Sequence, residues 1–337
     1  MIKTDIIIIG AGPVGLFTVF EAGLLKLKCH LIDSLPIAGG QCSEIYPKKP
    51  IYDIPGYPTI LAGDLIAKLM EQVKPFKPGF TLGETASKIE KKEDNQFIVT
   101  TKQGTKHIAP VVAIAGGLGV FIPRKPPINN LVAFENKGVA YIVKDPEIYR
   151  NKKIVISGGG DSALDWALFF ADNFSSKVTL VHRSQSFRAH LDSVQQAMTM
   201  AEHGEINLML DSEVVDLNGN EKLENITVKN KAKNKVSIET DYWLPLFGLT
   251  PKLGPIANWG LEIEKNAIVV NNATDYSTNI DGIYAIGDVN TYPGKLKLIL
   301  CGFHEATIMV QSAFKKIHPN KNNVLKYTTV SGITGFD

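Results

Sequence analysis

Two glycine-rich segments, about 150 residues apart in the chain, have the strand-turn-helix pattern of a dinucleotide-binding unit. In the first, an apolar strand over residues 5–9 precedes GAGPVG, and a helical run is expected from Leu16. Glycines at this spacing allow a tight turn, let the backbone approach a pyrophosphate, and let the helix pack closely on the strand. The pattern therefore predicts a pyrophosphate-binding turn made by Gly10, Gly12, Pro13 and Gly15.

The second segment, GGGDSALDWAL, follows an apolar strand that ends at Ile156. A single pattern of this kind is weak support for nucleotide binding, because any tight turn into a helix favours glycine. Two patterns in one chain, each opening its own strand-turn-helix unit, favour two bound dinucleotides. The expected contacts of the second are Gly158, Gly160, Asp161, Ser162 and Ala163.

The strand after each turn ends in residues of opposite charge. After the first turn this residue is Asp33, a carboxylate placed to accept hydrogen bonds from an unphosphorylated ribose. After the second turn the strand ends in His182 and Arg183, and Arg188 follows. Guanidinium groups in place of an acid suit a 2′-phosphate. The simplest interpretation is FAD in the first site and NADPH in the second.

The order of the remaining segments predicts that the second unit is inserted into the first. Strands are expected over residues 84–90, 96–101 and 106–114, and the segment FIPRKP then leads the chain out of the first unit. The chain returns near residues 246–251, and a buried strand follows that ends in Gly287 and Asp288, with a helix over 302–315. We predict an α/β fold of two Rossmann-like three-layer domains: an FAD domain of residues 1–118 and 249–337, and an NADPH domain of residues 119–248.

Composition and charge exclude several classes of function. The chain is 44% hydrophobic and 21% charged, with a net charge of +2, so no nucleic-acid-binding tail is expected. No apolar run approaches the roughly 20 residues that span a bilayer, and the first strand begins too early to leave room for a signal peptide. Three cysteines are too few and too scattered for a disulfide framework or a metal site. We expect a cytoplasmic protein without metal, membrane or nucleic-acid partner.

Several motifs together resemble the low-molecular-weight thioredoxin reductases over nearly the whole chain. The resemblance rests on GAGPVG, GGQ at residues 39–41, the second glycine turn with HRSQSFRAH, and IYAIGDV at residues 283–289. Those reductases carry a C-x-x-C just before the second turn, where this chain has VAYIV, residues 139–143. Without that dithiol, electrons on the flavin have no disulfide to reach, so thioredoxin reduction is disfavoured.

The remaining segments resemble the thioredoxin-reductase-like ferredoxin (flavodoxin)-NADP reductases. These segments are GGQCSEIYPKKPIYDIPGYP, GLGVFIPRKP, KLKLILCGFHEA and the C-terminal extension. The resemblance implies hydride transfer from NADPH to FAD, single-electron transfers to ferredoxin or flavodoxin, no catalytic acid or nucleophile, and a homodimer. It places FAD contacts at Asp33, Gly40, Gln41, Tyr46, Ala86, Phe121, Gly287, Asp288 and Thr329.

Two segments depart from that family's usual pattern. Ser184 occupies the position next to Arg183 where that family usually has a further arginine. The expected preference for NADPH over NADH is therefore smaller. The C-terminal tail leaves Tyr327 as the ring expected to cover the flavin on the side opposite Tyr46, with Phe336 as its rival.

Basic pairs that follow expected flavin contacts predict a docking rim for an acidic carrier. They are Lys48 with Lys49, Arg124 with Lys125, and Lys295 with Lys297. Two alternatives stay open: a reductase of a low-molecular-weight thiol disulfide, which would need a reactive cysteine such as Cys42, and a non-enzymatic flavin redox sensor. Cys42 and Cys301 are interpreted as packing residues.

Overall fold

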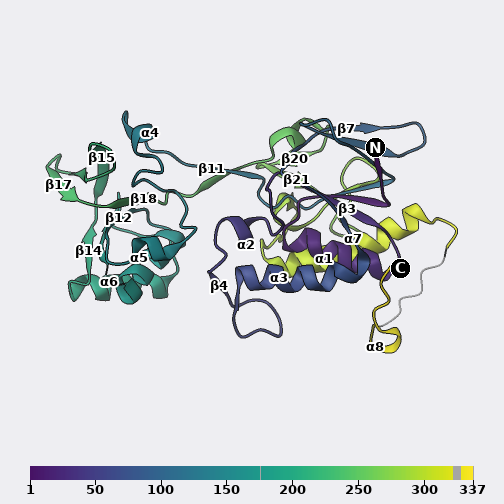
Figure 1. Cartoon of the computed structure of the whole chain (residues 1–337), viewed down its shortest axis with the longest axis horizontal. Coiled ribbons are helices and arrows are strands. Elements are labelled where there is room, and N and C mark those ends of the chain that lie inside the picture. Colours follow the sequence, from purple (N-terminus) through teal and green to yellow (C-terminus); the bar gives the residue numbers. More distant parts are fainter. Residues whose placement is uncertain (175, 322–327, 337) are drawn as a thin grey trace. The chain divides into compact units, whose positions relative to one another are not determined.

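A computed structural model describes residues 1–174, 176–321 and 328–336 of the 337-residue chain. The chain forms two compact units: residues 1–121 with 251–337, and residues 122–250. The chain passes between them at β11 (Val120–Pro123) and β19 (Leu249–Lys252), which pair as a two-stranded sheet (Figure 1).

The first unit is built on a five-stranded parallel sheet in the order β22-β10-β2-β3-β6. Its central strand β2 is four consecutive isoleucines, all buried, as expected for a parallel strand that is covered on both faces. Helices α1, α3 and α7 form one layer beside it (Figure 1). The bounds are β2 (Ile6–Ile9), α1 (Pro13–Leu24), β3 (Cys29–Asp33), α3 (Ala62–Val73), β6 (Gly79–Leu82), β10 (Val111–Ile114), β22 (Ile283–Ala285) and α7 (Ile299–Ile317).

A second sheet of the same unit has the order β1-β9-β8-β7, and its strands contribute Phe97, Val99 and Ala109 to the shared core. Its bounds are β1 (Ile2–Lys3), β7 (Ala86–Lys91), β8 (Phe97–Thr101) and β9 (Lys106–Ala109). Short elements complete the unit: α2 (Gln41–Glu44), β4 (Pro50–Ile51), β5 (Ile60–Leu61), η1 (Lys74–Phe76), η3 (Gly254–Asn258), β20 (Ile263–Glu264), β21 (Ala267–Val269), η4 (Gly287–Val289), β23 (Asn290–Thr291) and α8 (Thr328–Ser331).

The single strand expected over residues 106–114 is wrong, because the chain changes sheet at Pro110. Residues before the proline form β9, which pairs antiparallel with β8 in the second sheet, and residues after it form β10 in the parallel sheet. Proline has no N–H to donate and a fixed φ, so a ladder is readily broken there. As a result, one apolar run of the sequence supplies a strand to each of the two sheets of the unit.

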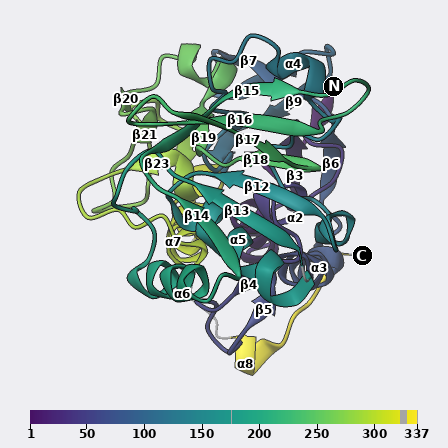
Figure 2. The ribbon, with the colours of Figure 1, turned by 90° about the vertical axis from the view of Figure 1, so that its left-hand side faces the viewer.

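The second unit has a four-stranded parallel sheet in the order β14-β13-β12-β18, facing helices α5 and α6 and a three-stranded antiparallel sheet, β15-β16-β17 (Figure 2). Side chains of β12 alternate between the two faces. Ile154 and Ile156 join the core with the helices, whereas Val155 joins the core that contains Trp243 and the antiparallel strands. The bounds are α4 (Leu131–Phe134), η2 (Pro146–Tyr149), β12 (Lys153–Ser157), α5 (Asp161–Phe174), β13 (Lys177–Val181), α6 (Leu191–Glu202), β14 (Ile206–Met209), β15 (Ser212–Asn218), β16 (Asn225–Asn230), β17 (Lys235–Glu239) and β18 (Tyr242–Pro245).

Two histidines are buried between the layers of the first unit. The Thr81 hydroxyl lies 2.8 Å from Nε2 of His30 and 2.9 Å from Nε2 of His107, and the two rings are 4.7 Å apart. Burial, with the neighbouring His107 as a second cause, lowers the pKa of His30 to about 4. Burial also lowers the pKa of His107. Both rings are therefore neutral near pH 7.

We expect the free energy of unfolding to fall by about 2 kcal/mol as the pH is lowered from 6.5 towards 4. In this window the unfolded chain protonates both histidines, while the folded chain resists protonation, so acid favours the unfolded state. Urea titrations at several pH values measure the slope. His30→Gln should flatten it; an unchanged slope in this variant would contradict the assignment.

No helix in the described part of the chain is both long and apolar enough to cross a membrane.

Candidate functional site

The first glycine turn is built so that only glycine fits at two of its positions. Gly10 has a φ of +109°, and a Cβ there would lie 2.4 Å from the carbonyl oxygen of Ala115. At Gly15 a Cβ would lie 2.1 Å from the carbonyl oxygen of Gly10. The turn between β2 and α1 is therefore held by backbone packing, independently of any ligand.

Gly12 differs, because a Cβ added there would meet no protein atom within 4 Å. Its φ of −74° suits any residue, and it is the N-cap of α1, with Pro13 in the first turn and no side chain capping the helix. The N–H groups of a helix N-terminus attract anions through hydrogen bonding and the helix dipole. The open space at Gly12 thus fits a pyrophosphate.

Asp33 lies beside this turn at the end of β3. Its Oδ2 accepts a hydrogen bond from the Ala11 N–H at 2.7 Å, and its Oδ1 accepts one from the Leu35 N–H at 2.9 Å. Burial raises the pKa of Asp33, and the backbone hydrogen bonds oppose that shift. The Glu84 N–H donates to the Asp33 carbonyl at 3.0 Å, which brings the segment leading to Ala86 next to Asp33.

Residues 39–41 lie against the same turn. The Gly39 N–H donates to the Ala11 carbonyl at 2.8 Å, and a Cβ on Gly40 would lie 3.2 Å from Cα of Gly12. A Cβ on Gly117 would lie 3.4 Å from Nε2 of Gln41. The structure therefore brings Gly40 and Gln41 to the glycine turn, although they come from a separate loop.

Tyr46, Cys42 and Asp288 interact although two distant segments supply them. Burial raises the pKa of Tyr46, with Cys42 as a further cause, and burial raises the pKa of the Cys42 thiol to about 11. Burial also raises the pKa of Asp288, which the charges of Lys295 and Lys297 lower. The Cys42 thiol is therefore protonated at neutral pH, as expected for a packing residue.

Gly287 and Asp288 begin η4, next to the N-terminus of α1. A Cβ on Gly287 would lie 3.3 Å from a methyl group of Val14. The carboxyl ends of neighbouring parallel strands meet at one edge of a sheet, which is where doubly wound folds bind ligands. Residues predicted from segments far apart in the sequence are thus gathered at this edge.

Sequence reasoning missed Glu305, a buried carboxylate on α7 that accepts hydrogen bonds from residues on both sides of Asp288. It forms an ion pair with Lys295, whose side chain is only 5% exposed. The expectation that Lys295 belongs to a docking rim is therefore wrong, because its ammonium points into the protein. A glutamate on the same helix face as Ala306, Met309 and Val310 was the signal that could have revealed it.

Phe336, one of the two C-terminal rings expected to cover the flavin, lies away from the first glycine turn. Phe336 packs 6.1 Å from Phe76, and its N–H donates to the Pro75 carbonyl. The Lys26 ammonium donates to the Thr334 carbonyl at 2.7 Å, just past the C-terminal end of α1, whereas the glycine turn is at the other end, about 18 Å away. The structure thus does not place Phe336 at the first glycine turn of its own chain.

For three other predicted FAD contacts, the structure shows no position beside the first glycine turn. Thr329 is exposed in α8, which is drawn below α3 in Figures 1 and 2. Tyr327 is outside the described residues, and so is the side chain of Phe121, whose backbone belongs to β11.

The second unit repeats the arrangement of the first turn. Gly158 has a φ of +156°, and a Cβ there would lie 2.6 Å from the Leu246 carbonyl oxygen and 2.8 Å from Cβ of Ala163. At Gly160 a Cβ would again meet nothing within 4 Å. Asp161 and Ser162 begin α5 and are exposed. This helix N-terminus therefore offers a second open space for phosphate.

Residues 182–190 fold back over the second turn. The Arg188 N–H donates to the Gly159 carbonyl at 2.7 Å, and the His182 ring stacks on Phe187 at 4.8 Å. The Ser184 hydroxyl donates to the Ser186 carbonyl at 2.9 Å. His182 and Ser184 thus make contacts within the segment of residues 182–190. Ser184 stabilises this segment at the position where the family resemblance led us to expect an arginine.

Arg183 and Arg188 are exposed residues of the segment that folds back over this turn. Within the part of the chain that the structure describes, no hydrogen bond or ion pair holds either guanidinium, so both can bind an anion. Asp161 is engaged, since its Oδ1 accepts a hydrogen bond from the N–H of His190, the N-cap of α6.

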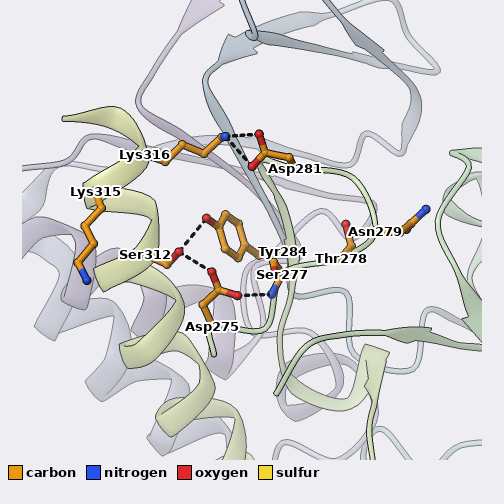
Figure 3. Close-up of a pocket in the computed structure, with 9 residues that line it drawn as sticks. All are labelled: Asp275, Ser277, Thr278, Asn279, Asp281, Tyr284, Ser312, Lys315 and Lys316. Carbon is orange, nitrogen blue, oxygen red and sulfur yellow. Dashed lines mark hydrogen bonds and ion pairs between the residues drawn. The ribbon is translucent and has the colours of Figure 1, made fainter. Parts of the chain in front are cut away.

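A polar pocket of about 460 Å³ lies elsewhere in the first unit, between the strand that precedes η4 and the C-terminal half of α7 (Figure 3). Ser312 donates to Asp275 at 2.6 Å and lies 3.1 Å from the Tyr284 hydroxyl, and Lys316 binds Asp281 at 2.7 Å. None of the predicted site residues lines it. Its contacts hold α7 against β22.

Among the described residues, no three His, Cys, Asp or Glu side chains gather as a metal site would require.

Comparison with known proteins extends through both units. Residues 4–312 match the family described as pyridine nucleotide-disulphide oxidoreductase. Ferredoxin-NADP reductase 1 of Christiangramia forsetii is 68% identical over 339 residues, covering 100% of this chain and 96% of that protein. The ferredoxin-NADP reductase of Flavobacterium psychrophilum is 66% identical with the same coverage. The crystal structure of Lactococcus lactis thioredoxin reductase in its FR conformation matches with a TM-score of 0.78 at 27% identity, covering 94% of this chain and 99% of that one.

Proposed function

Because the chain belongs to the pyridine nucleotide-disulphide oxidoreductase family, we propose that it transfers electrons between NADPH and ferredoxin or flavodoxin through bound FAD. The observation that carries the proposal is the pair of open helix N-termini at Gly12 and Gly160. One lies beside a carboxylate and the other beside two exposed guanidiniums. The relatives named ferredoxin-NADP reductase, which match the whole chain, support the carrier.

The residues present fit both cofactors. FAD would be held by the turn at Gly10, Gly12, Pro13 and Gly15, with Asp33 on the ribose and Gln41, Tyr46 and Asp288 towards the flavin. NADPH would be held by the turn at Gly158 and Gly160, with Arg183 and Arg188 on the 2′-phosphate. When bound, FAD supplies the chemistry that joins a two-electron donor to a one-electron acceptor.

The protein's own contribution is binding, orientation and electrostatics. Asp33 holds the Ala11 N–H at 2.7 Å and so fixes the turn that approaches the pyrophosphate. The hydrogen bond between Arg188 N–H and the Gly159 carbonyl, at 2.7 Å, fixes the second turn in the same way. Nothing in this scheme requires a catalytic acid or nucleophile among the side chains.

Stopped-flow measurement of flavin reduction and reoxidation tests the proposal. We expect NADPH to reduce the bound FAD rapidly, NADH to reduce it more slowly, and oxidised ferredoxin or flavodoxin to reoxidise it. Absence of FAD from the purified protein, and failure to reconstitute it, would refute the proposal. Rapid reduction without reoxidation by either carrier would support FAD and NADPH as the cofactors, but it would refute ferredoxin and flavodoxin as the electron acceptors.

The geometry disfavours Cys42 as the reactive cysteine of a thiol-disulfide reductase. Such an enzyme needs an accessible thiolate, but Cys42 is 2% exposed, and burial raises its pKa to about 11. Cys42→Ser should therefore retain NADPH-dependent reduction of the carrier. A non-enzymatic flavin sensor differs in another readout, since it would turn over slowly with every acceptor.

The homodimer and the cytoplasmic location are parts of the same proposal. The tail residues held at Lys26 and Pro75 lie away from the flavin turn of their own chain, which leaves α8 available to a second copy. Analytical ultracentrifugation tests the dimer. A monomer at micromolar concentration would contradict it.

The basic docking rim for the carrier is narrower than the sequence suggested. The side chain of Lys295 is buried. Arg124 and Lys125 are exposed but belong to the other unit, whereas Lys48, Lys49 and Lys297 are exposed in the first unit, which contains the proposed FAD site. These last three are the proposed contacts with an acidic carrier.

Replacing both Lys48 and Lys49 by Glu should raise the KM for ferredoxin about tenfold, because attraction to an acidic partner becomes repulsion. Reduction of an uncharged dye by NADPH should not change. The matched control is Lys231→Glu with Lys233→Glu, which alters the charge of an exposed turn in the other unit equally. Equal KM values for both double variants would remove Lys48 and Lys49 from the rim.

A further inference from the structure

Glu305 is a fully buried carboxylate that accepts hydrogen bonds from four donors. Its Oε2 accepts the Gly287 N–H at 2.6 Å and the Asn290 side-chain amide at 2.9 Å. Its Oε1 accepts the Tyr292 hydroxyl at 2.8 Å and the Lys295 ammonium. All four donors come from one stretch, residues 287–295, so a single side chain of α7 holds that whole segment.

The Glu305–Lys295 pair is isolated from solvent. The two side chains are 1% and 5% exposed, and their opposite charges cancel. Removing one partner from such a buried pair leaves an uncompensated charge where the dielectric constant is low, so its field extends to neighbouring groups with little screening.

The segment that Glu305 holds is the one that carries Asp288. Gly287 precedes Asp288, Asn290 follows it, and both donate to the same carboxylate oxygen. Gly302, one turn before Glu305 on α7, is packed so closely that a Cβ there would lie 2.4 Å from Val14 and 3.4 Å from Cα of Gly287. Helix α7 thereby joins the Asp288 segment to the N-terminal turn of α1, which is the expected pyrophosphate site.

We propose that the Glu305–Lys295 pair is the positioning element of the flavin site. Glu305 orients the Asp288 segment towards the flavin, and Lys295 cancels the charge of Glu305 and thereby sets the flavin's reduction potential. The inference rests on the proposed function, since it requires that FAD bind in the first unit. Neither residue needs to touch the flavin.

Single and double replacements of Glu305 and Lys295 distinguish the effect of their charges on the flavin's reduction potential from the effect of side-chain shape. Two-electron reduction makes the flavin more negative, so a lone positive charge nearby favours the reduced form and a lone negative charge disfavours it. Glu305→Gln, which leaves Lys295 unpaired, should strengthen binding of reduced relative to oxidised FAD about tenfold, a shift of about 30 mV to more positive potential. Lys295→Met should shift the potential the opposite way. The double variant and Lys295→Arg should return close to the wild-type potential.

Direct FAD titration of the apoprotein provides a readout without turnover. Glu305→Gln has one acceptor oxygen where the carboxylate had two, so the Asp288 segment is held less firmly and FAD affinity should fall about tenfold. Lys295→Met keeps both oxygens, and its affinity for oxidised FAD should stay within about threefold of wild type.

Shifts of the same sign in both single variants, or no shift in either, would overturn the inference. These results are distinct from failure of the proposed function, which would show as absence of FAD binding or of NADPH-dependent reduction in the wild-type protein. If one single variant does not fold, the other single variant decides together with Lys295→Arg. A shift of the expected sign in the remaining single variant, with the wild-type potential in Lys295→Arg, supports the pair; no shift or the opposite sign contradicts it.

Discussion

Gly12→Val is expected to abolish FAD binding while leaving the apoprotein folded. The Cβ of the valine would meet no protein atom within 4 Å, at a backbone conformation that valine tolerates. The same side chain would occupy the position of the pyrophosphate and block its hydrogen bonds to the N-terminus of α1. Loss of two charge-assisted hydrogen bonds weakens FAD binding about 100-fold or more. The loss of a good N-cap lowers the melting temperature of the apoprotein by no more than about 4 °C.

Fluorescence titration with FAD and thermal melting of the apoprotein measure the two parts of this expectation. Gly160→Val is the matched control, because it makes the same change in the same open geometry in the other unit. It should retain FAD and lose reduction by NADPH. Gly10→Val, where a Cβ would lie 2.4 Å from the Ala115 carbonyl oxygen, should instead destabilise the fold. Normal FAD affinity in Gly12→Val would refute the proposed pyrophosphate site.

Removing the two exposed guanidiniums of the second unit is expected to eliminate the preference for NADPH over NADH. Each charge-assisted hydrogen bond to a 2′-phosphate contributes about 1.5–3 kcal/mol, so Arg183→Ala and Arg188→Ala should each raise the KM for NADPH at least about tenfold. NADH has no 2′-phosphate, so its KM should change little. Steady-state dye reduction with each nucleotide measures the difference.

The control for this prediction is Arg150→Ala. Arg150 belongs to the same unit, but its guanidinium binds Glu147 at 3.0 Å and lies over the Phe174 ring. Its loss should affect both nucleotides equally. Parallel changes in the NADPH and NADH constants for Arg183→Ala or Arg188→Ala would show that the guanidiniums do not read the 2′-phosphate.

Local patterns predicted the parts of the fold that depend on nearby residues. The isoleucine run of β2 predicted a buried strand because a parallel strand is covered on both faces, and it forms one. Gly10 and Gly158 predicted tight turns, and both have positive φ angles that other residues rarely adopt. Helix α6, in contrast, gave no clear signal, since its sequence is polar and Ala197 is its one fully buried residue among those described.

Two side chains lie where distant contacts place them, and the sequence pattern did not predict those contacts. Lys295 follows an expected flavin contact, as a docking lysine would, yet its ammonium meets Glu305 in the protein interior. Phe336 is an aromatic residue near the C-terminus, as a flavin-covering ring would be, yet it packs on Phe76. A residue's type and spacing do not say which distant segment it meets.

For this chain, the sequence by itself determined the two nucleotide-binding turns, the charge that follows each, and the α/β architecture. These follow from short-range physics, because steric limits on φ and the alternation of side chains along a strand act within a few residues. Only the tertiary structure decided that Pro110 divides one apolar run between two sheets, that Glu305 accepts hydrogen bonds from four donors around Asp288, and that Phe336 packs on Phe76, away from the first glycine turn. Each of these depends on which backbone groups and side chains become neighbours on packing, and long-range packing decides that.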